Sequence, residues 1–229
     1  MSNSIINILS TNPGLFHPVV EVDKDNDRIV SIDLTSSNTS LNSDVVGDIA
    51  KFEAFVNEFL SLNGAKFAVG GYLEYRDLYS RSDVFSASSN DEERRLHLGI
   101  DIWGPSGTAV YAPVDGKVHS FAMNDVKGDY GATIILQHEI QGHCFHTLYG
   151  HLSASDLDIK LGQQIEKGSL LAHFGTHEEN GYWPPHLHFQ VIVDMENKQG
   201  DYPGVCSLKN KSYYANNCPD PNLILQLIN

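Results

Sequence analysis

A run of regularly alternating residues towards the end of the chain restricts the fold more than any other feature. Residues 186–191 read His-Leu-His-Phe-Gln-Val. Successive side chains of a β-strand point to opposite faces, so His186, His188 and Gln190 share one face and the apolar residues share the other. Same-face neighbours lie about 6.5–7 Å apart, which is too far for both imidazoles to bind one zinc ion easily at about 2.0–2.1 Å. One imidazole could therefore be a metal ligand while its neighbour acts on a bound substrate.

A second stretch, His-Leu-Gly-Ile-Asp-Ile at 97–102, alternates in the same way. A spacing of four residues would also place His97 and Asp101 on one face of a helix, but Gly99 and the β-branched isoleucines favour a strand. His97, Asp101 and one histidine of the first stretch would supply two imidazoles and a carboxylate. This is the open three-ligand set of a catalytic zinc ion. The alternative is two unrelated strands whose histidines only form hydrogen bonds.

The order of these motifs resembles the lysostaphin-type metallopeptidases, peptidase family M23. The motifs are His97-x-x-x-Asp101, then Tyr-Gly-His-Leu-Ser at 149–153, then His186-x-His188, with segments 110–118 and 162–168 also similar. The resemblance covers about residues 94–194. It implies that His97, Asp101 and His188 bind Zn²⁺ and that His151 and His186 form the catalytic pair.

Short, closely spaced strands are predicted through the same region. They are expected at 110–113, 117–122, 132–138, 144–149 and 165–174. This spacing favours a mainly β fold of antiparallel sheets, and two strand–turn–strand units look like the halves of a duplicated hybrid (barrel-sandwich) core. We divide the chain into an N-terminal α+β extension that packs on the core (1–90), an M23-like core (91–195) and a C-terminal tail (196–229).

The flanking segments carry their own patterns. Residues 17–22 and 28–34 are predicted to form a hairpin, and residues 66–72 a strand. Apolar residues at three- and four-residue steps predict the one main helix of the extension at 44–62, which ends at Gly64. Arg76 could line the groove, but a surface position is favoured, and residues 86–93 are assigned to a polar linker. The tail is expected to be a proline-punctuated coil whose apolar run, 223–228, docks on the domain.

His151 is a stronger site candidate than the other histidines, because it ends a strand and opens a turn where a site can be built. His143 and His146 are interpreted as structural. His138 and His177 are expected to be exposed, and His173 is expected to be a core imidazole.

Composition excludes some partners. The 229 residues contain 41% hydrophobic side chains and carry a formal net charge of −14, which argues against nucleic-acid or anionic-membrane binding. No segment approaches the roughly 20 apolar residues of a membrane span. The N-terminus lacks the basic region of a secretory signal, and three cysteines favour reduced thiols over a Cys206–Cys218 disulfide. We therefore expect a cytoplasmic protein, of bacterial origin by the resemblance.

The function implied is hydrolysis of a peptide bond. Either His151 or His186 would take the proton of the attacking water while the other steadies the oxyanion. The substrate is a peptidoglycan-like peptide, an intracellular peptide or another small amide. The flanks also resemble segments beside this domain in bacterial proteins that fuse it to kinase-like and aminotransferase domains.

Two rival functions stay open at this level. Barrel-sandwich phosphocarriers contain a similar His-x-Gly-Ile-Asp segment, so His97 alone does not separate them from a hydrolase. The other rival is a catalytically silent module that binds a metal or a peptide. The pattern leaves open the oligomeric state and whether the extension blocks the groove.

Overall fold

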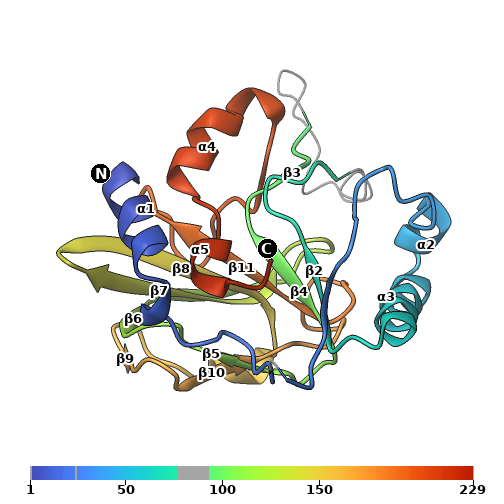
Figure 1. Cartoon of the computed structure of the whole chain (residues 1–229), viewed down its shortest axis with the longest axis horizontal. Helices are drawn as coiled ribbons and strands as arrows, with labels where there is room; N and C mark the ends of the chain where they lie inside the picture. Colours follow the sequence, from blue (N-terminus) through green and yellow to red (C-terminus); the bar gives the residue numbers. More distant parts are fainter. Residues whose placement is uncertain (1, 24, 77–92, 229) are drawn as a thin grey trace.

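The computed structural model describes residues 2–23, 25–76 and 93–228, and its centre is an eight-stranded sheet (Figure 1). The strand order is β1-β2-β4-β11-β8-β7-β6-β9. Its strands are β1 (Ile29–Ser31), β2 (Phe67–Gly70), β4 (Ile100–Trp103), β6 (Gly116–Asn124), β7 (Gly131–Ile140), β8 (His143–Leu152), β9 (Gln164–Ile165) and β11 (His186–Ile192). Neighbouring strands run antiparallel except β1 and β2. The predicted mainly β, antiparallel fold is confirmed, whereas the duplicated hybrid core stays a prediction.

Two small sheets complete the β structure. β5 (Ala109–Tyr111) pairs with β10 (Leu170–His173), and β3 (Leu96–His97) pairs with β12 (Val205–Cys206). The predicted continuous strand at 97–102 is wrong, because the chain leaves β12 after His97 and joins β11 from Ile100 onwards. Gly99 at this change of partner leaves space for the His188 ring, since an added Cβ would lie 2.4 Å from its Cε1.

The apolar face of β11 enters the main core, as its alternation predicts. Leu187, Phe189 and Val191 are fully buried among side chains of β4, β7 and β8. The opposite face carries His186 and His188, which are also buried because the tail and the extension cover them. The strand therefore separates an apolar core from an enclosed polar site.

The extension adds strands to the central sheet. The predicted hairpin is wrong: β1 pairs in parallel with β2, and residues 17–22 lie outside any strand. Backbone bonds from His17 N to Pro113 O and from Tyr111 N to Val19 O instead hold this segment against β5. β2 then pairs with β4, so that Gly70 lies opposite Asp101.

The predicted main helix is two helices, α2 (Ser43–Gly47) and α3 (Ile49–Asn63). Asp48 separates them because its backbone is extended and its side chain accepts hydrogen bonds from Ala50 N and Lys51 N, which makes it the N-cap of α3. The helix ends at Gly64 in the left-handed conformation, as predicted.

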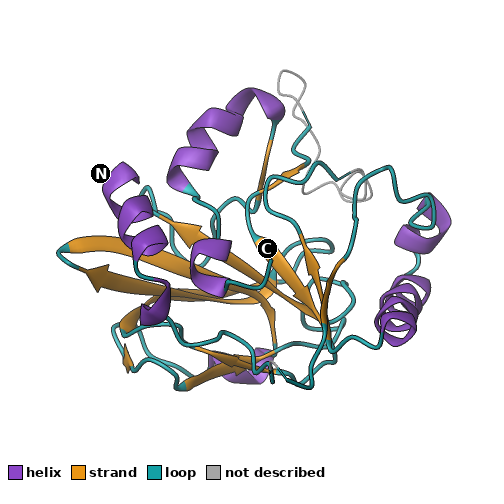
Figure 2. Ribbon diagram, viewed as in Figure 1, coloured by secondary structure: helices purple, strands orange, loops and turns teal. Residues whose placement is uncertain are grey.

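The tail contains helices that the sequence pattern did not reveal. α4 (Lys211–Asn217) and α5 (Asn222–Leu225) lie on the same side of the molecule as α1 (Ser2–Thr11), opposite α2 and α3 (Figure 2). Short 3₁₀ turns occur at Pro13–Leu15, Ala154–Leu157 and Leu208–Asn210. Docking of the tail is confirmed, because Ile224 and Leu225 are buried in the main core.

Both flanks share sheets with the predicted core: β2 of the extension pairs with β4, and β12 of the tail pairs with β3. The predicted domain boundaries at residues 90 and 195 stay a prediction. Most of the predicted linker at 86–93 lies outside the described residues. Among the helices of the described chain, none has the length and apolar character needed to cross a bilayer.

Candidate metal centre

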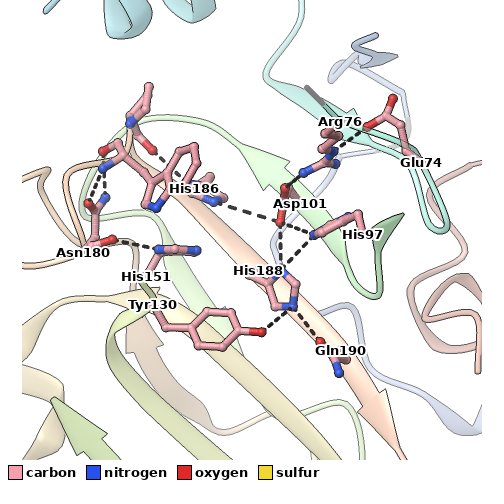
Figure 3. A network of polar contacts seen from close by, with 12 residues as sticks. Glu74, Arg76, His97, Asp101, Tyr130, His151, Asn180, His186, His188 and Gln190 are labelled. Carbon is pink, nitrogen blue, oxygen red and sulfur yellow. Dashed lines mark hydrogen bonds and ion pairs between the residues drawn. The ribbon is translucent and has the colours of Figure 1, made fainter. Parts of the chain in front are cut away.

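Three predicted ligands converge on one point. β11 and β4 are neighbours in a register that sets His188 opposite Asp101, and His97 comes from β3 beside them. His97 Nε2 lies 3.0 Å from His188 Nδ1 and 3.3 Å from Asp101 Oδ1, and the latter two atoms are 3.1 Å apart (Figure 3). All three side chains are buried. No other group of three or more such side chains in the described chain has this arrangement.

The outer hydrogen bonds of the two imidazoles determine which nitrogens face this point. His97 Nδ1 donates to Gly71 O at 3.1 Å, so its Nε2 carries a lone pair. Gln190 Nε2 donates to Pro203 O, which turns Gln190 Oε1 towards His188 Nε2 at 2.9 Å. His188 therefore donates from Nε2 and holds a lone pair on Nδ1. Two lone pairs and a carboxylate oxygen meet with no hydrogen among them, an arrangement that calls for a cation.

A zinc ion fits these distances. Ligand atoms about 2.0–2.1 Å from a tetrahedral zinc lie about 3.3–3.4 Å apart, close to the 3.0–3.3 Å found here. The donor set of two neutral imidazoles and one carboxylate is that of zinc sites with an open fourth position. Of the two histidines on β11, His188 is the one whose nitrogen joins the group, while His186 Nε2 lies 4.0 Å from Asp101 Oδ1.

The second carboxylate oxygen of Asp101 is held by a residue that the sequence reasoning placed elsewhere. Arg76 was assigned to the surface, but its side chain is only 1% exposed, and its Nη1 lies 2.5 Å from Asp101 Oδ2. Its Nε donates to Glu74 Oε2 at 2.6 Å. Burial alone would raise the pKa of Asp101, but His97 and Arg76 hold it well below its usual value. The sequence contains no spacing signal for this pair, because 25 residues separate its members.

His151 and His186 form a stacked pair beside the ligands. Their ring centroids are 4.1 Å apart at an interplanar angle of 30°. His186 Nδ1 donates to Pro184 O and His151 Nδ1 donates to Asn180 O, each at 2.8 Å, so both Nε2 atoms carry lone pairs. Burial lowers the pKa of His186 to about 4 and that of His151 well below its usual value. Two neutral imidazoles are thus available to accept protons.

The backbone of His151 is unusual. Its φ of 63° lies in the left-handed region, which costs a non-glycine residue free energy and is enriched at functional sites. Its backbone N–H donates to Tyr130 O at 2.7 Å, and its carbonyl accepts from Gly175 N at 2.9 Å. These bonds hold the irregular backbone near the end of β8 from which His151 faces His186.

A cavity of about 230 Å³ brings all five predicted site residues together. It is lined by Arg76, Arg94, His97, Asp101, Trp103, Gly128, Asp129, Tyr130, His151, Trp183, His186, His188, Lys198, Asp201, Tyr202, Pro203, Gly204 and Val205. Trp103 stacks on His186 with centroids 3.9 Å apart at 16°, and Trp183 lies edge-on to both His151 and His186. The sequence reasoning did not select these aromatic residues, because tryptophans in strands and loops are as readily explained by core packing.

The remaining histidines lie outside this cavity. His138, predicted to be exposed, is buried: Nδ1 bonds to Asp115 O at 2.9 Å and Nε2 to Thr147 Oγ1 at 2.7 Å. His173, predicted to be a core residue, has a side chain 38% exposed and pairs with Asp156 at 3.2 Å. Cys206 and Cys218 are buried free thiols, in line with the preference for reduced cysteines.

Comparison with known proteins gives a family match. The family described as Peptidase family M23 matches residues 95–200. An uncharacterized metalloprotease of Haemophilus influenzae is 38% identical over 101 residues, which are 44% of this chain and 19% of that protein. The peptidoglycan DD-endopeptidase ShyA of Vibrio cholerae is 34% identical over 125 residues, which are 50% of this chain and 26% of that protein. The chain thus spans about a fifth to a quarter of the length of these relatives.

Solved structures are also similar. The solution structure of lysostaphin has 28% sequence identity and a TM-score of 0.37, with 49% of this chain and 41% of that chain covered. A zinc-containing peptidase from Vibrio cholerae has 28% identity and a TM-score of 0.35, with 48% and 31% covered. The predicted resemblance to fusion proteins with kinase-like and aminotransferase domains stays a prediction.

Proposed function

Residues 95–200 are a peptidase family M23 domain, and from this premise we propose that the chain is a zinc-dependent hydrolase of peptide bonds. The observation that carries the proposal is the convergence of one atom each from His97, Asp101 and His188 at 3.0–3.3 Å, while Gly71 O and Gln190 Oε1 bond the outer nitrogens of the two imidazoles. The name of the relative ShyA, a peptidoglycan DD-endopeptidase, supports a peptidoglycan-like peptide as the substrate class. We retain the absence of a nucleic-acid partner as part of this proposal.

His97 Nε2, Asp101 Oδ1 and His188 Nδ1 would hold the ion. When bound, Zn²⁺ supplies a Lewis acid that polarises the scissile carbonyl and acidifies a water molecule. The protein contributes a buried, pre-arranged donor set in which Gly71 O and Gln190 Oε1 fix the two imidazole tautomers. Trp103, Tyr130 and Trp183 line the same cavity and form its apolar walls.

His151 and His186 would move the proton. Each keeps Nδ1 bonded to a backbone carbonyl, so only Nε2 can exchange protons with a substrate in the cavity. One of them accepts the proton of the attacking water, and it can later return that proton to the leaving amine. The other can donate a hydrogen bond to the oxyanion only as an imidazolium, so its Nε2 has to take up a proton from solvent before the oxyanion forms.

The site geometry disfavours the phosphocarrier alternative. A phosphocarrier histidine needs an open ring nitrogen, but His97 is buried and its Nε2 lies 3.0 Å from another imidazole nitrogen. The adjacent Asp101 carboxylate would also repel a phosphoryl group. Incubation with a phosphorelay donor should therefore leave the protein unphosphorylated.

Metal analysis and peptide assays on single variants test the proposal. We expect the purified protein to bind about one zinc and to hydrolyse peptidoglycan stem or cross-bridge peptides, and His188→Ala and Asp101→Ala to lose the metal. His186→Ala should keep the metal and lose hydrolysis, whereas the half-exposed His177→Ala should change neither. Loss of metal from His186→Ala would overturn the division of roles. A zinc-loaded protein that cleaves no peptide would instead support a silent binding module.

A further inference from the structure

The segment that precedes the family domain contributes a side chain to the metal centre. Arg76 lies outside the matched residues 95–200, yet its guanidinium contacts the carboxylate of Asp101 on the side away from His97 and His188 (Figure 3). Of the two Asp101 oxygens, Oδ2 faces Arg76 and Oδ1 faces the two imidazole nitrogens. The arginine therefore bonds the oxygen that the ion would not need.

The backbone fixes Arg76 relative to the ligands. Arg76 N donates to Arg95 O at 2.9 Å, and His97 N donates to Glu74 O at 3.0 Å, so residues 74–76 run alongside residues 95–97. An isolated bridge between Tyr75 and Leu96 lies in the same place. The side chain that reaches Asp101 thus starts from backbone that is hydrogen-bonded to the strand carrying His97.

Space for the guanidinium is provided by a glycine. Gly70 on β2 lies opposite Asp101 on β4, and an added Cβ there would lie 2.7 Å from Arg76 Nη2. A side chain at this position would occupy the slot through which Arg76 reaches Asp101. Glu74 completes the arrangement by accepting from Arg76 Nε, so the planar guanidinium bonds two carboxylates from different edges.

We propose that Arg76 is a positioning residue for the metal ion: by holding Asp101 Oδ2, it makes Asp101 a ligand through Oδ1 alone. This inference rests on the metal site of the proposed function. A carboxylate free to rotate can offer both oxygens to a metal, which fills an additional coordination position. With Oδ2 held by Arg76, a position stays open for water or substrate, as catalysis at such a site requires. The N-terminal extension then contributes a positioning side chain to the metal site in addition to covering it.

Two substitutions separate the charge of Arg76 from its geometry. Arg76→Met removes both, whereas Arg76→Lys keeps a buried positive charge but cannot bond two carboxylates in one plane. Arg28→Met is the matched control, because the Arg28 guanidinium bonds to Asn63 O at the exposed end of the same extension. Zinc affinity is measured by competition with a chromogenic chelator, and folding by circular dichroism.

We expect both Arg76 variants to bind zinc about 10- to 100-fold more weakly than the wild type, and Arg28→Met to bind it equally well. With Co²⁺ in place of zinc, the visible absorption of the Arg76 variants should weaken, because a freed Oδ2 raises the coordination number. A purely structural ion pair would change stability but neither the spectrum nor the affinity of the folded protein. If neither variant folds, Glu74→Gln provides the test, with a smaller loss of affinity expected because the ion pair between Glu74 and Arg76 Nε is weakened while Arg76 keeps its charge.

Folded variants with wild-type zinc affinity and an unchanged Co²⁺ spectrum would overturn the inference. Failure of the wild-type protein to bind zinc at all would instead overturn the proposed function, so the two failures are distinguishable.

Discussion

Replacing Gly99 with alanine should weaken metal binding without altering any ligand. Gly99 lies between β3 and β4, where the chain passes the His188 ring. An added Cβ would lie 2.4 Å from His188 Cε1, 2.6 Å from His188 Nε2 and 2.9 Å from Phe189 O. Ordinary contacts begin near 3.4 Å, so either the ring or the backbone has to move by about 1 Å.

The size of the effect follows from what holds the ring. His188 Nε2 donates to Gln190 Oε1, and Nδ1 would bind the ion, so the ring cannot turn away without losing a partner. Zinc–ligand distances tolerate about 0.2 Å of error, so a displacement of about 1 Å removes the His188 bond. We expect zinc affinity to fall at least 10-fold, about 1.4 kcal/mol, and the metal-free protein to lose about 1–3 kcal/mol through overpacking.

Zinc titration against a chelator and urea unfolding in excess chelator measure the two effects separately. Gly14→Ala is the control, because an added Cβ there meets nothing within 4 Å, and we expect it to leave both quantities unchanged. A Gly99→Ala protein that is destabilised but binds zinc with wild-type affinity would refute the reasoning. It would mean that the backbone yields and the ring keeps its place.

Two further predictions concern side chains behind the site and in the sheet. Phe52→Ala should lower the free energy of unfolding by about 3–5 kcal/mol, because Phe52 is fully buried against Trp103 and Trp183. It should also reduce hydrolysis, because Trp103 in turn stacks on His186. The half-buried Phe59→Ala should cost less in urea unfolding and leave hydrolysis unchanged; equal effects would contradict this. Burial lowers the pKa of His138 to about 4, below its unfolded value of about 6.5, so the unfolded state binds more protons and stability falls as pH drops from 6.5 towards 4. Between pH 7 and 4.5 the wild type should lose about 2–3 kcal/mol more than His138→Gln in urea unfolding, and parallel pH profiles would show that His138 does not contribute.

Local patterns predicted which side chains share a face of a strand and where a helix ends. The alternation of β11 gave its two faces, and Gly64 gave the end of α3. The break at Asp48 lies within a continuous apolar periodicity, so only the capping property of the aspartate distinguishes one helix from two. The false hairpin has a different cause: β1 pairs with a strand more than 30 residues away, and a short loop between two apolar runs does not reveal such a partner.

Burial of polar side chains was the least predictable property. Arg76 and His138 were both assigned to the surface, which is the usual place for arginine and for a histidine at the end of a strand. Each is buried because a partner from another segment satisfies it, the Asp101 carboxylate for Arg76 and the Asp115 carbonyl for His138. The ligands themselves were predictable because their motifs are local, although their convergence depends on the pairing of β4 with β11.

Residues outside the matched domain orient all three candidate ligands. They do so directly for His97 and Asp101, and through Gln190 for His188. The tautomer of His97 depends on Gly71 O, and the single free oxygen of Asp101 depends on Arg76; both lie before the matched domain. His188 depends on Gln190, whose amide is turned by Pro203 O, beyond the other end of the match. A metal site loses affinity when a ligand is badly oriented as well as when it is absent. The flanking segments therefore contribute to the same site as the family motifs, although the family match does not include them.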